Sequence, residues 1–332
     1  MSERQKTVQS HNQHMLNDED SITAASTATR LNARTATVSK ILNFSCVDGP
    51  GNRLVIFLQG CNYQCKSCHN PQTIDMCNHC GDCVETCPTG ALKLVSIIEN
   101  KQSKPAPNNP QKVKWDASLC SHCDNCLAVC PKQSSPKTQQ YTVAEMLDVI
   151  RNNLFFISGI TVTGGEATLQ LGFIQGLFSA IKSSSNLQHL TCMIDSNGSL
   201  RTTSWAKLLP FTDGVMVDLK AWQEETHLWL TGRQHHRVFQ SIELLAQHNK
   251  LYEVRLLHIP GKTDFDAEVD ELASYLTQLP KDTRIKLNAF QHHGVTGEAL
   301  TWDTCQKSDI THLANQLTER NVRNIVVPPI YL

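Results

Sequence analysis

The sequence predicts an α/β protein built on a partial barrel of about six parallel strands, interrupted near its start by a small inserted domain. From residue 141 onward, apolar runs typical of strands alternate with segments of helical periodicity. Polar residues follow the carboxyl ends of successive strands. The segment 72–138 instead holds eight of the fourteen cysteines and has little apolar periodicity, which is typical of a domain held together by metal rather than by a hydrophobic core.

Composition limits the partners of the chain. Its 332 residues carry a formal net charge of −1, which indicates no basic surface for nucleic acid. No stretch approaches the roughly 18 consecutive apolar residues of a membrane helix. The first 36 residues are polar and lack the apolar core of a signal peptide. We therefore expect a disordered extension over 1–36 and a cytoplasmic protein that binds neither nucleic acid nor membranes.

The barrel is expected on both sides of the insert 72–138, over 37–71 and 139–332. Its first strand, RLVIFLQG (53–60), leads into a loop with three cysteines. Helices are predicted at 141–154, which carries a Thr142-to-Glu145 capping box, and at 264–279, where apolar residues recur at helical spacing. Five further strands are predicted in GITVTGG, LTCMIDSNG, GVMVDLK, LYEVRLLHIPG and TRIKLNAF.

The position of the polar residues favours a barrel over an open sheet. An open doubly wound sheet also binds ligands at strand carboxyl ends, but usually at one switch point. Here five consecutive strands contribute, as in barrel enzymes. The polar clusters are Gly164-Gly165-Glu166, Asp195-Ser196-Asn197, Asp218-Leu219-Lys220, His258 and Gln291-His292-His293.

Eleven of the fourteen cysteines fall into groups of three, four and four. At such spacings in a reducing compartment, cysteines are metal ligands more often than disulfides. The remaining three, Cys46, Cys192 and Cys305, are expected to be buried and inert.

The two groups of four each have the spacing C-x2-C-x2-C-x3-C-P of bacterial ferredoxins, which carry two 4Fe–4S clusters. In that arrangement the fourth cysteine of each run ligates the other cluster. Two zinc knuckles are the alternative. The expected ligand sets are Cys77, Cys80, Cys83 and Cys130 for one cluster, and Cys87, Cys120, Cys123 and Cys126 for the other.

The group of three is open. Cys61, Cys65 and Cys68 have the spacing C-x3-C-x2-C, and three thiolates can hold a 4Fe–4S cluster while leaving its fourth iron free for an outside ligand. A zinc site completed by His69 is the alternative. That site would leave the distant polar strand ends with nothing to bind, so we expect the free position to take substrate.

A C-x3-C-x2-C motif on the loop after the first barrel strand resembles that of radical S-adenosylmethionine (SAM) enzymes. The flanking DGPGNRLVIFLQGC and HNP resemble those of the glycyl radical enzyme activating enzymes, relatives of the pyruvate formate-lyase activase. Within that family, the chain is most similar to members with an eight-cysteine ferredoxin insert. The resemblance covers 40–332.

The resemblance implies roles for individual residues. The free iron would chelate the methionine end of SAM, with Gly164, Gly165 and Glu166 at its amino group and Lys220 at its carboxylate. Arg255 would lie near the substrate. The DSNG and VMVDLK segments, which include Asn197 and Leu219, would line the SAM site and hold a monovalent cation through Asp195, Ser196, Asp218 and the carbonyl of Met216.

Three positions depart from the family pattern. Ser67 replaces the usual aromatic residue before the third cysteine, Ala167 replaces the proline after the GGE motif, and Gln291 aligns with a late histidine that helps to hold SAM, with His292 one residue on. His69 belongs to the HNP segment that borders the SAM site.

A cation between the two aspartates has a reason of its own. Carboxylates that converge with no lysine between them repel, and a bound ion relieves this. Each aspartate taken alone is more often a solvated strand-end carboxylate.

The implied activity is reductive cleavage of SAM to methionine and a 5′-deoxyadenosyl radical, which takes a hydrogen atom from a glycine of a partner glycyl radical enzyme. A flavodoxin or ferredoxin would supply the electron. A flexible glycine-bearing loop of the partner would enter at the barrel opening, past Arg255 and His258. Two alternatives are a radical SAM enzyme acting on a small molecule or on another protein residue, and a ferredoxin-like electron carrier.

Overall fold

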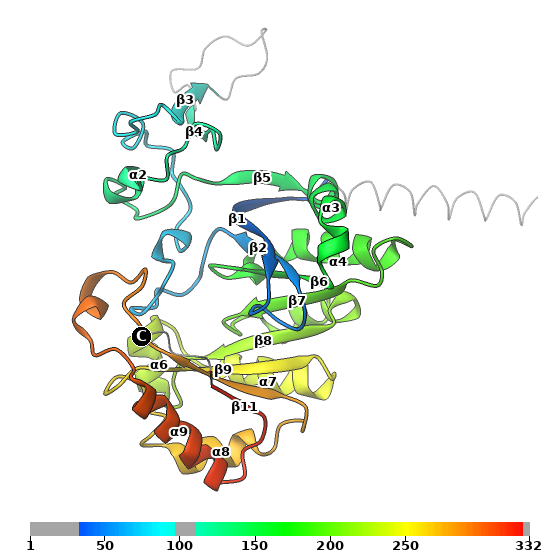
Figure 1. The fold of residues 1–332 in the computed structure, drawn as a ribbon, viewed down its shortest axis with the longest axis vertical. Helices are drawn as coiled ribbons and strands as arrows, with labels where there is room; N and C mark the ends of the chain where they lie inside the picture. Colours follow the sequence, from blue (N-terminus) through cyan, green and yellow to red (C-terminus); the bar gives the residue numbers. More distant parts are fainter. Residues whose placement is uncertain (1–32, 97–110, 328–332) are drawn as a thin grey trace, which may run out of the picture.

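The computed structural model describes residues 33–96 and 111–327, whose main sheet has nine strands (Figure 1). Their order is β11-β10-β9-β8-β7-β6-β2-β1-β5. The strands are β1 (Thr35–Ser45), β2 (Arg53–Leu58), β5 (Gln139–Thr142), β6 (Gly159–Gly164), β7 (Thr191–Ser196), β8 (Gly214–Leu219), β9 (Leu251–His258), β10 (Arg284–Ala289) and β11 (Ile325–Val326).

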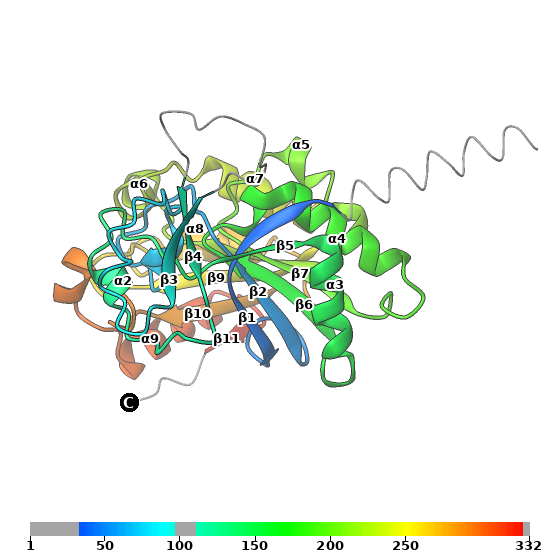
Figure 2. The same cartoon turned by 90° about the horizontal axis from the view of Figure 1, so that it is seen from above.

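The strands from β2 through β6 to β11 run parallel and lie side by side in chain order, whereas β1 pairs antiparallel with both β2 and β5. A doubly wound sheet reverses its order at a switch point. This sheet has no reversal along its parallel strands, and Figures 1 and 2 show it curving with helices along its outer side. The predicted partial barrel is therefore confirmed.

The helices connect these strands. The α-helices of the barrel are α3 (Val143–Asn152), α4 (Leu171–Ser183), α5 (Thr202–Trp205), α6 (Glu224–Thr231), α7 (His236–Gln247), α8 (Val269–Leu276) and α9 (Lys307–Glu319). The short 3₁₀ turns are η1 (Pro71–Thr73), η2 (Leu154–Phe156), η3 (Ala167–Gln170), η4 (Leu209–Phe211) and η5 (Gly297–Thr301). The capping box predicted for Thr142 and Glu145 is present at the start of α3.

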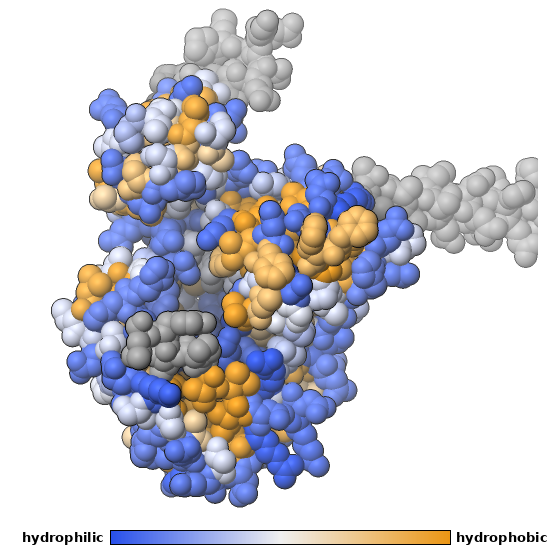
Figure 3. Space-filling view, in the orientation of Figure 1, coloured by the Kyte–Doolittle hydropathy of each residue, from blue (hydrophilic) through white to orange (hydrophobic). Residues whose placement is uncertain are grey.

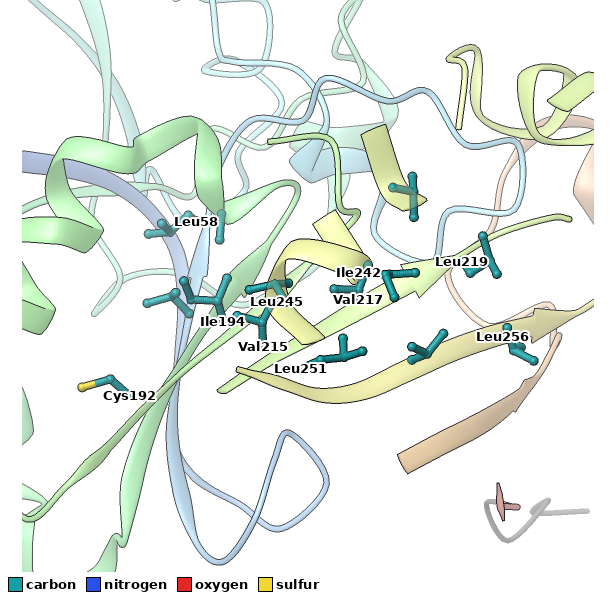
Figure 4. Close-up of a cluster of buried hydrophobic side chains, with 14 of the residues drawn as sticks. Leu58, Cys192, Ile194, Val215, Val217, Leu219, Ile242, Leu245, Leu251 and Leu256 are labelled. Carbon is teal, nitrogen blue, oxygen red and sulfur yellow. The ribbon is translucent and has the colours of Figure 1, made fainter. Parts of the chain in front are cut away.

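Side chains along each barrel strand point alternately to the hydrophobic core and to the inside of the barrel. On β8, Val215 and Val217 belong to the hydrophobic core, and Figure 4 shows them facing Ile242 and Leu245 of α7. Asp218, the residue after Val217, faces a cavity inside the barrel. Because successive side chains of a strand point to opposite faces, the core lies between sheet and helices while the inner face is free for polar residues.

The insert contains a hairpin and one short helix, β3 (Leu92–Ser96), β4 (Gln111–Trp115) and α2 (Asn125–Ala128). In Figures 1 and 3 it forms a small lobe at the top of the molecule, apart from the barrel. Its own core of buried apolar and thiol side chains is small: Cys83, Leu92, Val113 and Cys126.

The structure corrects two expectations about the elements. Residues 1–32 of the predicted extension lie outside the described residues, but β1 begins at Thr35, where alternation of buried and less buried residues along TATVSKIL sets an antiparallel strand beside β2. The helix predicted over 264–279 spans only Val269–Leu276, because Asp264 instead accepts hydrogen bonds from the backbone before α6.

Among the three cysteines outside the groups, Cys46 is exposed, which corrects the expectation that it is buried, whereas Cys192 and Cys305 are buried as expected.

Within the described residues, no helix is long and apolar enough to cross a membrane.

Candidate active site

A cavity of about 590 Å³ lies inside the barrel at the carboxyl ends of the strands. All six strands from β2 to β10 in the parallel series contribute to its wall. The strand residues that line it are Phe57, Thr163, Gly164, Asp195, Ser196, Asp218, Arg255, Leu257, Asn288 and Ala289. The three cysteines of the loop after β2 line the same cavity, so the open cysteine group and the polar strand ends meet, as the sequence predicts.

The cysteine loop is held by its backbone at both ends. The amides of Gly60 and Cys61 donate to the carbonyls of Thr73 and Ile74, each at 2.8 Å. Farther along the loop, the amides of Gln64 and Lys66 donate to the carbonyls of Thr231 and Leu230 at the end of α6, at 3.0 and 2.9 Å. The helix terminus has free carbonyls for this purpose. The loop is therefore fixed against the barrel on two sides.

The three thiols of this loop are free and fit a positively charged metal group. Burial raises the pKa of Cys61 and of Cys65 to about 12 and also raises that of Cys68. Thiolate is the form that ligates metal. A buried thiol becomes a thiolate only when a cation compensates its charge, so metal binding here releases protons. Three such thiols around one cavity suit an iron–sulfur cluster.

His69, the alternative fourth zinc ligand, also lines this cavity. Its Nε2 is buried and has no hydrogen-bond partner among the described residues, and burial lowers its pKa. The ring is therefore neutral and free to meet a ligand. Ser67 lines the cavity as well and is buried.

The GGE segment fastens β6 to the cysteine loop. Gly165 donates its amide to the carbonyl of Leu58 at 3.0 Å, and Glu166 donates its amide to that of Gly60 at 2.8 Å. A Cβ at Gly164 would lie 2.1 Å from the carbonyl oxygen of Leu58, and one at Gly165 2.3 Å from that of Gly60. Both glycines line the cavity, but their lack of a side chain serves close packing against this backbone.

Glu166 does not line the cavity, and here the structure departs from the expected contact with SAM. Its side chain is buried and accepts from the hydroxyl of Ser196 at 2.9 Å and from the amides of Asn197 and Thr168 at 2.7 and 3.0 Å. The hydroxyl of Thr168 is a further donor to it. The carboxylate therefore ties β6 to the end of β7, and both of its oxygens are occupied.

The cation expected at the two aspartates rested on the premise that no basic side chain lies beside them, and the structure corrects that premise. Nη1 of Arg255 lies 2.8 Å from Oδ2 of Asp195, and Nζ of Lys220 lies 2.8 Å from Oδ2 of Asp218. Arg255 also pairs with Glu253 at 2.7 Å and contacts Sδ of Met216. Every second residue of β9 faces the barrel interior, which brings Arg255 between the aspartates.

One oxygen in this network is unpaired. Oδ1 of Asp195 is buried and has no hydrogen-bond partner in the described part of the chain, while its Oδ2 also accepts from the hydroxyl of Thr163 at 3.0 Å. Leaving a buried carboxylate oxygen unsatisfied is costly. An ammonium group, a hydroxyl or a cation in the cavity would satisfy it.

The remaining predicted residues divide between the cavity and its surroundings. Asn197 and Gln291 line the cavity, and Gln291 also donates to the carbonyl of Cys305 at 3.0 Å. Leu219 is in the hydrophobic core on the outer face of β8, and His292 is exposed with Nε2 beside the carbonyl of Trp302. Neither side chain lines the cavity.

His258 does not lie on a path into the barrel. It is on the outer face of β9, three residues after Arg255, with Nε2 3.6 Å from a carboxylate oxygen of Asp266. The inward neighbour is Leu257, which lines the cavity. Because side chains alternate along a strand, Leu257, two residues after Arg255, could have been predicted to face the cavity.

Sequence reasoning also missed Asn288 and Asp48. Asn288 is an inward residue of β10 at the cavity wall, and strand alternation was the available signal. Asp48, in the DGPG segment between β1 and β2, lines the cavity although it precedes β2. Its position depends on how the β1–β2 connection folds, which a residue pattern does not reveal.

The eight cysteines of the insert gather as the ferredoxin pattern predicts. One hollow is lined by Cys87, Cys120, Cys123 and Cys126, and a second by Cys77, Cys80, Cys83 and Cys130. All eight are free thiols. Each hollow thus takes three cysteines from one run and the fourth from the other. Within the described residues, no three Cys, His, Asp or Glu side chains are arranged around a single metal ion.

The comparisons with known proteins agree with these groups. Residues 76–134 match the family model described as a 4Fe-4S dicluster domain, and residues 47–95 match that of a 4Fe-4S single cluster domain. These matches favour iron–sulfur clusters over zinc in both regions of the chain.

Curated relatives span most of the chain. A pyruvate formate-lyase-activating enzyme of Streptococcus mutans is 26% identical over 268 residues, covering 78% of this chain and 79% of the relative. A putative glycyl-radical enzyme activating enzyme of Haemophilus influenzae is 28% identical over 283 residues, covering 78% and 84%. Among solved structures, a domain of a pyruvate-formate lyase-activating enzyme from Bacteroides vulgatus has a TM-score of 0.43 at 18% identity, covering 52% of this chain and 99% of that domain.

The relatives, the iron–sulfur family models and the open cysteine group at the carboxyl end of a partial barrel agree with one another. Over 78% of its length, the chain is thus similar to glycyl radical enzyme activating enzymes.

Proposed function

We propose that this chain cleaves SAM reductively and uses the resulting 5′-deoxyadenosyl radical to take a hydrogen atom from a glycine of a partner glycyl radical enzyme. The observation that carries the proposal is one cavity of about 590 Å³ that joins the three open cysteines to charged residues from three neighbouring strand ends. A 4Fe–4S cluster, when bound at Cys61, Cys65 and Cys68, supplies one electron that breaks the C5′–S bond of SAM and releases methionine.

The residues around the cavity would hold SAM in place. The partly buried ammonium of Lys220 suits the carboxylate of SAM, and its pairing with Asp218 keeps it charged. Oδ1 of Asp195 has no hydrogen-bond partner among residues 33–96 and 111–327 and can accept from the amino group of SAM. Phe57 and Leu257 supply apolar wall for the adenosyl part. Positioning in a site closed to water protects a reactive radical.

We further propose three 4Fe–4S clusters in each chain, two of them in an insert that spans 72–138. The two four-cysteine hollows support this number. A flavodoxin or ferredoxin would give the electrons. Two closed clusters have no free iron for a substrate, so they suit electron transfer to the open site.

A monovalent cation at Asp195, Ser196, Asp218 and the carbonyl of Met216 is also part of the proposal. The unpaired Oδ1 of Asp195 supports it. Because Arg255 and Lys220 already compensate both aspartates, such an ion would bind weakly unless one of these pairs opened.

The substrate of the radical is proposed to be a protein because the relatives are named for activating glycyl radical and pyruvate formate-lyase enzymes. A small-molecule radical SAM enzyme would use the same iron ligands. A simple electron carrier would have no use for the large cavity beside the open cysteine group.

Anaerobic reconstitution tests the proposal. The reduced chain should convert SAM to 5′-deoxyadenosine and methionine and should carry about twelve irons. Cys65→Ala should abolish cleavage and leave roughly eight irons, whereas Cys46→Ala, at an exposed cysteine outside all three groups, should change neither. SAM cleavage by Cys65→Ala at the wild-type rate would contradict the open-cluster site.

A further inference from the structure

The outer face of the β3–β4 hairpin carries a lysine patch formed by Lys93, Lys112 and Lys114. Lys93 lies directly opposite Lys114 in the antiparallel pairing, and Lys112 lies opposite Val95 on the same face. All three lysines are exposed, and ion pairs in the described part of the chain are made by other lysines. Like charges directly opposite one another destabilise a hairpin, and a two-stranded hairpin is only marginally stable by itself.

The inner face of the same hairpin covers both cysteine sets of the insert. Leu92 and Trp115, which pair with each other, line the hollow of Cys87, Cys120, Cys123 and Cys126. Val113, two residues away on β4, lines the hollow of Cys77, Cys80, Cys83 and Cys130. The hairpin is one chain thick, so the lysine patch lies one strand layer from both cluster sites.

The opposite side of the insert is joined to the barrel. The amide of Ser134 lies 3.4 Å from the sulfur of Cys130, and its hydroxyl donates to the carbonyl of Asp75 at 2.6 Å. Gln59, at the end of β2, donates to the same carbonyl at 2.7 Å. These contacts place the hollow of Cys77, Cys80, Cys83 and Cys130 on the barrel side, leaving the hairpin on the free side of the lobe.

We propose that the lysine patch of Lys93, Lys112 and Lys114 is the docking surface for a carboxylate-rich electron-carrier protein, which delivers electrons to the insert. The inference rests on the proposed function, because it assumes that the insert holds two clusters. Charge complementarity selects the partner: three exposed ammonium groups on one face attract an acidic surface and raise the rate of encounter. In each step the carrier loses one electron and one insert cluster gains it.

The patch has a simpler explanation, since lysines on a short two-stranded sheet also prevent its edges from pairing with other chains. Protection of the sheet edges requires positive charge but no electron-carrier protein. The two explanations differ in how fast an acidic carrier reduces the chain, and in how that rate depends on salt.

The experiment measures cluster reduction by stopped-flow absorbance in the reconstituted full chain, with an acidic flavodoxin in its fully reduced form as donor. The wild-type rate should fall steeply as ionic strength rises, because the attraction is screened. Lys93→Gln, Lys112→Gln and Lys114→Gln combined should slow reduction about tenfold or more at low salt and flatten the salt dependence. The matching triple arginine variant should retain the wild-type rate.

Two controls separate the outcomes. Lys207→Gln, Lys281→Gln and Lys307→Gln combined remove three exposed charges from the barrel and should leave the rate unchanged. Dithionite should reduce the patch variant as fully as the wild type, with the same iron content. An unchanged flavodoxin rate and salt dependence in the patch variant would overturn the docking surface. Absence of reducible clusters in the wild-type insert would instead overturn the proposed function.

Discussion

Glu166 is buried, 1% exposed, between the ends of β6 and β7, and its carboxylate accepts hydrogen bonds from Thr168, Ser196 and Asn197. Hydrogen bonds to a charged acceptor are the stronger ones in proteins. The residue positions two parts of the cavity wall that come from different strands. We therefore expect Glu166 to affect SAM binding indirectly, by holding Ser196 and Asn197 in position at the cavity wall.

Glu166→Gln should lower the free energy of unfolding by about 1–3 kcal/mol, because the amide nitrogen would face donors that a carboxylate oxygen now satisfies. Urea unfolding of the anaerobic protein measures this. Glu243→Gln, at an exposed position of α7, should leave stability unchanged. A loss of SAM affinity in Glu166→Gln with wild-type stability would indicate a direct contact with SAM instead.

His227 supports the cysteine loop from α6. Its ring is buried, with Nδ1 donating to the carbonyl of Arg233 at 2.7 Å, and the neighbouring Thr231 accepts from the amide of Gln64 in the cysteine loop. Burial lowers the pKa of His227 to about 4. Because the folded-state pKa is below the ordinary 6.5, this histidine contributes stability that is present above pH 6.5 and is lost as pH falls toward 4.

The wild type should therefore lose about 2 kcal/mol of stability at His227 between pH 7 and pH 5. His227→Asn keeps a side-chain donor but does not titrate, so the difference in unfolding free energy between the two proteins should shrink by that amount over this range. His248→Asn, at an exposed residue after α7, is the control. A difference that stays constant with pH would show that His227 is not buried as neutral imidazole.

Site residues could be predicted from the sequence where their role follows from the spacing of nearby residues. The cysteines of the open group, with Lys220 and Asp195, could be assigned to one site from their spacing and strand-end positions. The pairing of Asp195 with Arg255 could not, because it depends on which residues of β9 face inward. Nor could the donation from Ser196 and Asn197 to Glu166, because those two residues lie at the end of the neighbouring strand.

At the scale of elements, the end of β6 packs directly on the start of the cysteine loop. The amides of Gly165 and Glu166 donate to β2 and to Gly60, and the site for a Cβ on Gly165 is filled by backbone. The loop is thus anchored by one strand end and by the carbonyls that terminate α6.

Gly165→Ala should displace the cysteine loop, since its Cβ would lie 2.3 Å from the carbonyl oxygen of Gly60. After reconstitution the variant should hold roughly eight irons instead of about twelve, and should lose SAM cleavage. Gly172→Ala in α4 is a matched control, because its Cβ would meet Arg34 at an ordinary 3.6 Å. Full iron loading of Gly165→Ala would show that the contact does not position the loop.

Elements were predictable where periodicity is strong. The parallel strands and the capped helix α3 follow from alternation and from the Thr142–Glu145 box. The antiparallel β1 was missed because its sequence follows a long polar segment, and β5 is only four residues long. The true length of α8 depends on a tertiary hydrogen bond that Asp264 accepts from the amide of Trp222.

At the scale of the whole molecule, the two four-cysteine runs exchange their last members. Cys87 lines a hollow with the second run and Cys130 lines one with the first. The ferredoxin spacing made this exchange predictable, whereas the hydrogen bond from Gln59 to the carbonyl of Asp75, which joins the barrel to the insert, had no signal in the sequence.

Single substitutions test the exchange by electron-spin spectra of the dithionite-reduced chain. Cys130→Ser should perturb the same cluster signal as Cys80→Ser, and Cys87→Ser the same signal as Cys123→Ser, because each pair ligates one cluster. Cys305→Ser, at a buried cysteine away from all three groups, is the control. If Cys87→Ser and Cys80→Ser altered the same signal, each run would bind its own cluster.

The most direct measurement of the whole account is the radical on the partner. The reduced, reconstituted chain is incubated with SAM and a glycyl radical enzyme from the same organism, and the electron-spin spectrum is recorded. The account predicts a doublet that collapses when glycine carries alpha deuterium, one 5′-deoxyadenosine for each radical, and no signal with Cys65→Ala. Repeated turnover of SAM with a metabolite, without any protein radical, would contradict it.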